Sequence, residues 1–287
     1  MSDRKVTVVM GVYNQHRKEQ LEEAVRSILS QTMREWELII CDDGSEGEAA
    51  RHLKAYEGRD ERIRLFRHSR NRGLAAALNA CISLARGSYI ARMDADDISM
   101  PDRLEKQYRF LEAHPEYAFV GCSAWLIDDN GAWGIRNMPE QPCRMDFLPF
   151  SPFIHPSVMV RREVYLASGG YLVSEQTCRC EDYELFMRLY AQGFRGYNLQ
   201  ERLFCYREGR ESYERRTFRF RLNEAGIRQR SFRDLGLTGP YARLCALRPM
   251  AAGLLPVPVL MYMKRRQARK EAARIESHGP EWQWQTE

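Results

Sequence analysis

The chain has no internal repeat, no low-complexity linker and no long unbroken run of apolar residues in its 287 positions. Its apolar stretch near the end, residues 250–263, is broken by prolines and is too short for a typical transmembrane helix. Apolar residues still make up 44% of the sequence, enough to fill a sizeable core, which argues against a disordered chain. The length predicts one large domain, alone or with an extension.

Signals for disulfides, zinc and nucleic acid are also weak or missing. Eight cysteines are scattered along the chain, and no signal-peptide pattern precedes the first strand-like run at Lys5. We therefore expect reduced thiols in the cytoplasm. Cys178 and Cys180 form a lone C-x-C without a second ligand pair, which favours ordinary thiols over a zinc site. The net charge of +5 is too small to indicate nucleic acid, although residues 264–270, KRRQARK, are a dense basic run.

Strand and helix patterns alternate through the first part of the chain. Apolar, β-branched runs predict strands, and apolar residues at three- and four-residue spacing predict helices. The strands are expected at 5–12, 36–45 with a closing turn, 62–66, 88–93, 117–128 and 157–162, and the helices at 18–32, 49–56, 73–85, from Pro101 to about 113, and 181–193. This alternation favours an α/β fold with a mostly parallel sheet, whose ligands bind beyond the carboxyl ends of the strands.

Polar residues gather at three of these predicted strand ends. They are Tyr13 and Asn14, then Asp42 and Asp43, then a D-x-D motif in which Asp94 and Asp96 flank Ala95 and Asp97 follows. Because parallel strand ends share one edge, the groups should converge there. Clustered carboxylates are costly unless a cation or proton settles among them, and Mg²⁺ or Mn²⁺ suits carboxylates combined with phosphate oxygens. The alternative is a solvated or capping loop.

Three other candidates each have a structural and a functional interpretation. Asp42 and Asp43 precede a Gly-Ser turn, so they either cap that turn or accept the N3-H of a uracil or thymine base. Glu181 and Asp182 begin a predicted helix, where they either favour the helix dipole or supply a base for an acceptor hydroxyl. His155, which precedes a proline, is either a structural or a catalytic histidine.

Six segments, taken in order and spacing, resemble inverting glycosyltransferases of family two with the GT-A fold. They are 6-VTVVMGVYNQ-15, 37-ELIICDDGSEG-47, 71-NRGLAAALNACISLARGSYIARMDADD-97, 100-MPDRLEKQ-107, 155-HPSVMVRR-162 and 181-EDYELFMRL-189. The resemblance covers residues 5 to 207. It implies a Rossmann-like, mostly parallel central sheet flanked by helices.

The resemblance also implies roles for individual positions. Those implied to bind nucleotide are Val12, Tyr13, Asn14, Asp42, Asp43, Asp94 and Ala95, with Asp43 holding the pyrimidine. Asp96 is the implied metal ligand, together with Asp94. Asp182 is the implied base beside Glu181, and His155 is a candidate for the acceptor or donor site. Gly11 and Cys41 depart from the common Pro and Val or Ile, and both changes suit a buried strand.

The resemblance implies a metal-dependent enzyme, with Mn²⁺ or Mg²⁺, that transfers a hexosyl or N-acetylhexosaminyl group from a UDP-sugar type of donor. The acceptor would be a saccharide or a lipid-linked saccharide in cell-surface polysaccharide synthesis. The absence of a Q-x-x-R-W type motif after Cys205 argues against a polymerising synthase. Two alternatives are a sugar nucleotidyltransferase, for which no Gly-rich phosphate loop is visible, and a non-catalytic basic module that binds membrane or nucleic acid. The acidic residues at the strand ends argue against nucleic acid as a partner.

We expect a catalytic domain at residues 1–210, with a nucleotide-binding half at about 1–100 and an acceptor half at about 101–210. Residues 211–287 are expected to form a basic and apolar helical extension with a loose tail from about 276. Its segment 244–270 predicts peripheral contact with the inner face of the cell membrane, through apolar side chains and the basic run. The alternative is that this segment packs on the catalytic domain or on a partner.

Overall fold

A computed structural model of the protein describes residues 4–209 and 217–273. The expected loose tail and residues 213–216 of the arginine-rich stretch lie outside the described residues. The strands are β1 (Val6–Val12), β2 (Trp36–Asp42), β3 (Ile63–Arg67), β4 (Tyr89–Arg92), β5 (Ile98–Ser99), β6 (Phe119–Asp128), β7 (Gly131–Arg136), β8 (Met159–Arg161) and β9 (Gly196–Arg207). The helices are α1 (Lys18–Leu29), α2 (Gly47–Lys54), α3 (Leu74–Leu84), α4 (Arg103–Ala113), α5 (Arg162–Ser168), α6 (Glu181–Ala191), α8 (Phe218–Asp234), α9 (Pro240–Gly253) and α10 (Val257–Ala273), with short 3₁₀ turns η1 (Arg144–Phe147) and η2 (His155–Ser157).

The described strands form one sheet in the order β3-β2-β1-β4-β8-β6-β9-β5, and β7 pairs with β6. β3, β2, β1 and β4 are parallel to one another, as the alternating sequence pattern predicts. β8 is antiparallel to both β4 and β6, whereas β6 and β9 are parallel. The expected α/β fold with a mostly parallel central sheet is confirmed.

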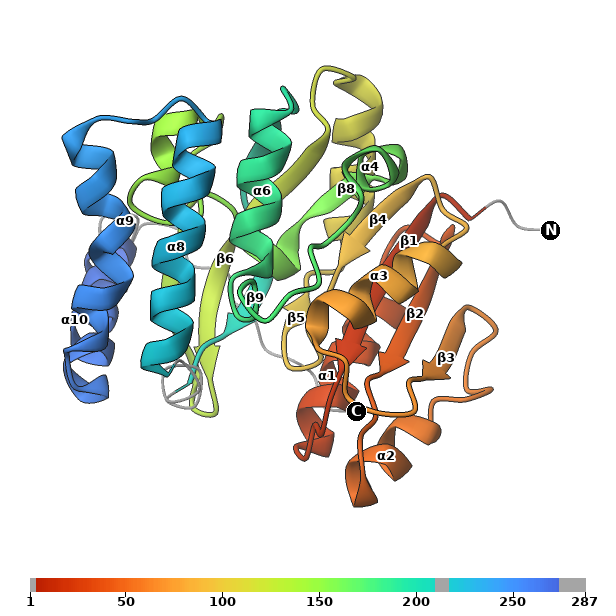
Figure 1. The fold of residues 1–287 in the computed structure, drawn as a ribbon. Coiled ribbons are helices and arrows are strands. Elements are labelled where there is room, and N and C mark those ends of the chain that lie inside the picture. Colours follow the sequence, from red (N-terminus) through yellow and green to blue (C-terminus); the bar gives the residue numbers. More distant parts are fainter. Residues whose placement is uncertain (1–3, 210–216, 274–287) are drawn as a thin grey trace.

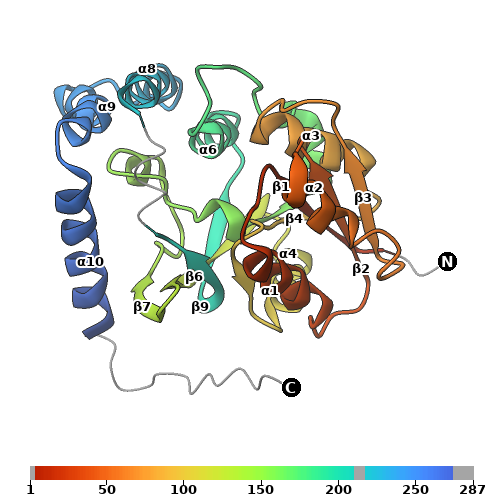
Figure 2. The same cartoon turned by 90° about the horizontal axis from the view of Figure 1, so that it is seen from below.

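Helices cover both faces of this sheet, as Figure 2 shows. α1 and α4 lie on one face and α3 and α6 on the other. Successive residues of a strand point to opposite faces of the sheet, and helices bury both faces. Each face therefore has its own hydrophobic core. Ile39 and Ile90 pack on the α3 side, while Leu38 and Ala91 pack on the α1 side.

The sheet register brings the carboxyl ends of three neighbouring strands to one edge. Val12, the last residue of β1, is paired with Asp42, the last residue of β2, and Arg92 at the end of β4 is paired with Val9. On the other side of β4 the antiparallel strand β8 begins, so the turn η2 that precedes β8 lies beside the end of β4. The segments after β1, β2 and β4 and the segment before β8 therefore meet at the same edge.

The C-terminal helices pack against the half of the molecule that follows β4. α8 lies beside α6, α9 lies beside α8, and α10 runs along β7 (Figures 1 and 2). This packing corresponds to the second of the two expectations for the segment 244–270. Among the described residues, no helix combines the length and the apolar character that a membrane crossing requires.

Candidate active site

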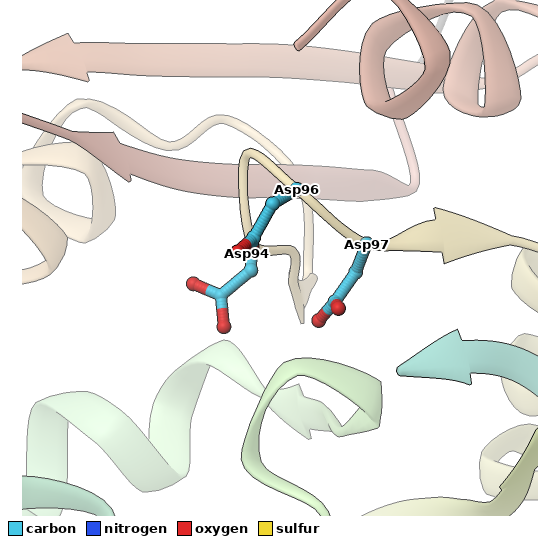
Figure 3. Close-up of side chains that lie close together, drawn as sticks. All are labelled: Asp94, Asp96 and Asp97. Carbon is cyan, nitrogen blue, oxygen red and sulfur yellow. The ribbon is translucent and has the colours of Figure 1, made fainter. Parts of the chain in front are cut away.

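Three aspartates lie on the turn between β4 and β5. Carboxylate oxygens of Asp94, Asp96 and Asp97 all lie within 4.8 Å of one another. Figure 3 shows them on a single loop, with the carboxyl groups of Asp94 and Asp97 directed to the same side. Burial and the neighbouring charge of Asp94 raise the pKa of Asp96 to about 6. Burial, followed by repulsion from the other two aspartates, raises the pKa of Asp97 well above its usual range.

These raised pKa values indicate a site where negative charge is not balanced by the protein alone. Oδ1 of Asp97 accepts a hydrogen bond from the backbone N–H of Arg207 at 2.6 Å. Its Oδ2 is buried and has no hydrogen-bond partner among the described residues. An all-oxygen donor set with an unsatisfied buried oxygen fits a hard divalent cation such as Mg²⁺ or Mn²⁺.

Two arginines that sequence reasoning did not single out hold this turn in place. Arg92 is 1% exposed at the end of β4 and forms an ion pair with Asp94. Arg207, at the end of β9, donates from Nε to the carbonyl oxygen of Asp96 at 2.8 Å and from Nη2 to Glu23 at 2.8 Å. The only sequence signal for Arg92 is a charged residue in an otherwise apolar strand next to the aspartates.

Asp43 lies just after β2 in a tight cage of donors. Its side chain is 3% exposed. The carboxylate accepts hydrogen bonds from the backbone N–H groups of Arg72, at 3.0 and 3.1 Å, and of Gly73, at 2.8 Å. Oδ1 also lies 2.7 Å from Nδ1 of His68. Asp43 thus fixes the loop that leads into α3, and it does so at the edge where the candidate nucleotide residues gather.

Asp42 behaves as the structural interpretation predicts. Its Oδ1 accepts the backbone N–H of Ser45 at 2.7 Å, and its Oδ2 pairs with Arg67 at 3.1 Å. Ser45 in turn accepts the N–H of Asn14 at 2.9 Å, and Asn14 has a positive φ of 48°. This network joins the ends of β1 and β2.

The two residues before Asn14 flank this network. Val12 is buried, while the ring of Tyr13 is 52% exposed at the rim. An exposed ring beside a cage of backbone amides is a suitable surface for stacking a nucleotide base. The end of β2 and the end of β4 are separated by β1 alone, so these two strand ends lie roughly 10 Å apart.

His155 lies on the turn η2 and is buried. Its Nε2 lies 2.7 Å from the hydroxyl of Tyr171, which lies 3.1 Å from the hydroxyl of Tyr165. Burial, together with the charge of Arg92, lowers the pKa of His155 well below its usual range, so the ring is neutral. The structure therefore gives His155 a hydrogen-bonded structural setting close to the aspartate turn.

Glu181 and Asp182 occupy the first turn of α6. Burial, then the charge of Asp182, raises the pKa of Glu181, whose Oε2 has no hydrogen-bond partner among the described residues. The charge of Asp182 is also among the causes that raise the pKa of Tyr171. Asp182 therefore lies near the His155–Tyr171 pair.

A cavity of about 590 Å³ opens beside Asp182 and His155. Its lining combines aromatic, apolar and charged side chains from residues 126–208 and from α8 and α10. The aspartates of the β4–β5 turn are not part of this lining in the described chain. The structure thus shows two adjacent polar regions, one at the strand ends and one at the start of α6.

The comparisons with known proteins agree with this arrangement. The family model of glycosyl transferase family 2 matches residues 7–168. The chain is 40% identical to the putative glycosyltransferase EpsE of Bacillus subtilis, over 92% of this chain and 95% of that protein. It is 34% identical to the O-antigen biosynthesis glycosyltransferase WbnJ of Escherichia coli, over 70% of this chain and 79% of that one.

Solved structures show the same fold at low sequence identity. The mannosyltransferase PcManGT from Pyrobaculum calidifontis, in complex with GDP-Man and Mn²⁺, matches with a TM-score of 0.63 and 18% identity, over 94% of this chain and 82% of that one. Residues 1–349 of TarS from S. aureus, in complex with UDP-GlcNAc, match with a TM-score of 0.61 and 14% identity, over 96% and 76%.

The fold and the family match together define a GT-A glycosyltransferase. The chain belongs to glycosyl transferase family 2 and is an enzyme of that class. Glycosyl transfer is therefore favoured over the two alternatives of nucleotidyl transfer and a non-catalytic binding module.

Proposed function

We propose that this protein is a metal-dependent, inverting glycosyltransferase that moves a hexosyl or N-acetylhexosaminyl group from a UDP-sugar to a saccharide or lipid-linked acceptor in cell-surface polysaccharide synthesis. One observation carries the proposal. The carboxylates of Asp94, Asp96 and Asp97 gather within 4.8 Å on the same sheet edge as Asp43, with Asp182 in the adjacent cavity.

The roles follow from the chemistry of each position. Asp182 takes the proton of an acceptor hydroxyl as that oxygen attacks the anomeric carbon and the bond from this carbon to the diphosphate oxygen breaks. A single displacement from the opposite side inverts the configuration. Asp43 and the exposed ring of Tyr13 bind the base, while Val12, Asn14, Asp42, Asp94 and Ala95 shape the rest of the nucleotide site.

Asp96, with Asp94, would hold Mn²⁺ or Mg²⁺. When bound, such a cation supplies positive charge that stabilises a leaving diphosphate. Support comes from the oxygen-only donor set and from the PcManGT structure, which was solved with Mn²⁺. Asp97 differs from its two neighbours, since its carboxylate is bound to the backbone of Arg207. We assign Oδ1 of Asp97 to holding the turn, while its unsatisfied Oδ2 stays available to the cation site.

The relatives support the cellular role. EpsE is named as a putative glycosyltransferase, and the names of AmsE and WbnJ refer to glycosyl transfer in amylovoran and O-antigen biosynthesis. We propose a peripheral position at the cytoplasmic face of the cell membrane, with residues 1–210 as the catalytic domain and the segment 244–270 as the membrane-facing part. Exposed apolar side chains support this contact, among them Leu254 at 79% exposure. Lys264 and Arg265, however, form ion pairs with Glu208 and Asp128 of the catalytic part.

A panel of UDP-, GDP- and dTDP-sugars, incubated with the full chain and Mn²⁺, tests the transfer reaction. We expect turnover that releases UDP and is lost with EDTA, and we expect nuclear magnetic resonance of the product to show an inverted anomeric centre. Release of pyrophosphate instead, or retention of configuration, would contradict the proposal. Flotation with phosphatidylglycerol vesicles tests the membrane contact, which Leu254→Asp should weaken.

A further inference from the structure

The cavity beside Asp182 has two walls that come from different parts of the chain. One wall belongs to the acceptor half and includes His155, Asp182 and Tyr183. The other belongs to the C-terminal helices, and the residues that it contributes are Arg221, Glu224 and Arg228 from α8 and Leu260, Met263, Lys264, Gln267 and Ala268 from α10. The C-terminal helices are therefore part of the cavity rather than an appendage at a distance from it.

Close packing fixes the position of α10 on the catalytic part. Ala268 is 5% exposed, and a Cβ added at Gly134 of β7 would lie only 2.9 Å from the Cβ of Ala268. The helix can approach this strand so closely because both positions are small. Arg265 pairs with Asp128 at 2.8 Å, and its guanidinium lies 5.2 Å from the ring centre of Trp133. These contacts hold α10 in a fixed position, so that one wall of the cavity is rigidly attached to the catalytic part.

α8 is fixed next to the candidate base by a buried arginine. Arg228 donates hydrogen bonds to the carbonyl oxygens of Leu148, at 3.2 Å, and of Cys245, at 3.3 Å. Its guanidinium lies 4.8 Å from the ring centre of Tyr183, the neighbour of Asp182. An ion pair with Glu224 at 3.0 Å satisfies the buried charge. The start of α6 and the α8 wall therefore form one packed unit.

The lining of the cavity suits a sugar ring better than a purely apolar ligand. The volume of about 590 Å³ falls within the range of small-molecule sites, roughly 300–1,000 Å³. Aromatic rings such as Phe150 and Tyr206 offer flat apolar surfaces, and the carboxylates and guanidinium groups offer directional partners for hydroxyl groups. A cavity next to a base that deprotonates a hydroxyl is well placed to receive the acceptor.

We propose that α8 and α10 form the wall of the acceptor subsite that selects the acceptor saccharide, with Met263 at its mouth as a specificity-determining residue. This inference rests on the proposed glycosyl transfer. Met263 is 56% exposed and lines the cavity, so a larger side chain there narrows the entrance without disturbing a core. The extension then acts in substrate selection in addition to any contact with a membrane.

Two neighbouring substitutions separate this role from a general effect of α10. Met263→Trp puts a bulky ring at the mouth of the cavity. Tyr262→Trp places the same ring on an adjacent position that is 67% exposed and does not line the cavity. The probes are p-nitrophenyl glycosides of glucose, galactose, N-acetylglucosamine and N-acetylgalactosamine. Binding is measured by saturation-transfer NMR, and transfer is measured with the donor found in the nucleotide-sugar panel.

We expect wild type and Tyr262→Trp to bind and glycosylate the same glycoside, and we expect kcat/KM for that glycoside to fall about tenfold or more in Met263→Trp. Binding of UDP with Mn²⁺ should stay unchanged in both variants, and acceptor-free hydrolysis of the donor should stay unchanged in Tyr262→Trp. Equal acceptor kinetics for the two variants would overturn the inference, and so would a wild type that binds none of the glycosides. Absence of donor binding and hydrolysis in the wild type would instead refute the proposed function.

Discussion

Replacement of Asp43 by asparagine tests the donor cage at the end of β2. The wild-type carboxylate accepts N–H groups from Arg72 and Gly73 and contacts the ring of His68, all while 3% exposed. Asparagine keeps one oxygen and replaces the other with an N–H₂ group. In the most favourable arrangement, the amide oxygen of asparagine accepts from the two backbone N–H groups and its N–H₂ group points toward His68. The ring of His68 can accept this hydrogen bond in the tautomer that leaves Nδ1 unprotonated.

The cost of this change follows from the loss of charge. A hydrogen bond to a charged group contributes about 1.5–3 kcal/mol, compared with about 0.5–1.5 for a neutral one. Two backbone donors therefore each lose about 1 kcal/mol, and the free energy of unfolding should fall by about 2 kcal/mol. If Asp43 also holds the base, the affinity for UDP with Mn²⁺ should fall by about tenfold, since one bond weakened by 1.4 kcal/mol has that effect.

Urea denaturation and calorimetric titration with UDP and Mn²⁺ measure the two effects separately. Asp60→Asn is a suitable control, because Asp60 caps a turn before β3, at the opposite edge of the sheet, and pairs with Arg62 at 2.8 Å. It should leave UDP affinity unchanged. If Asp43→Asn lost stability as calculated but bound UDP normally, Asp43 would be an anchor for the loop and not a nucleotide ligand. Unchanged stability would refute the hydrogen-bond reasoning itself.

Three further predictions address catalysis, charge and packing. Asp182→Asn should lower kcat by about 10²–10⁴-fold with UDP affinity unchanged, and normal turnover in steady-state assays would remove Asp182 from the role of base. Glu22 pairs with Arg59, which together with Tyr56 lowers the pKa of Glu22 from 4.5 to about 2. A depressed pKa adds stability above pH 4.5 that is lost as pH falls toward 2, so Glu22→Gln should cost about 1 kcal/mol at pH 7, discounted for exposure, and nothing at pH 2 in urea titrations. Gly196→Ala should cost about 1–3 kcal/mol in the same assay, because its Cβ would lie 2.4 Å from the Phe119 ring; an unchanged midpoint would contradict this.

The parallel half of the sheet could be predicted from sequence because its strands are buried on both faces. The runs expected at 5–12 and 88–93 correspond to β1 and β4 within one or two residues at each end. β9 was not predicted. Its polar residues break the apolar alternation, and its pairing with β6 shifts register around Ser123, so its position depends on partners distant in sequence. The hydrogen bond from the backbone N–H of Arg207 to Asp97 could not be predicted either, because it depends on the position of β9.

Other outcomes combine local turn signals with tertiary contacts that the sequence pattern does not reveal. Asp42 has the turn-capping role that its Gly-Ser neighbours indicated, since its carboxylate is occupied by Ser45 and Arg67. The buried charge of Arg92 is offset by its ion pair with Asp94. The basic run at 264–270 was consistent with either a membrane surface or packing. The close approach of Ala268 to Gly134, together with the ion pairs of α10, places this helix on β7.

The pairing of β4 with β8 explains how the fold brings the aspartate turn, which is the candidate metal site, next to the turn η2. β4 runs toward the aspartate turn and β8 runs away from η2, so the antiparallel pair places the two turns side by side, joined by the N–H of Arg92 and the carbonyl of Val158 at 2.9 Å. His155, on η2, then contacts Tyr171. Burial raises the pKa of Tyr171, and the charge of Asp182 adds a smaller contribution in the same direction. Because the β4–β8 contact and the His155–Tyr171 contact are hydrogen-bonded, the sheet holds the candidate metal turn and η2 in fixed positions next to each other.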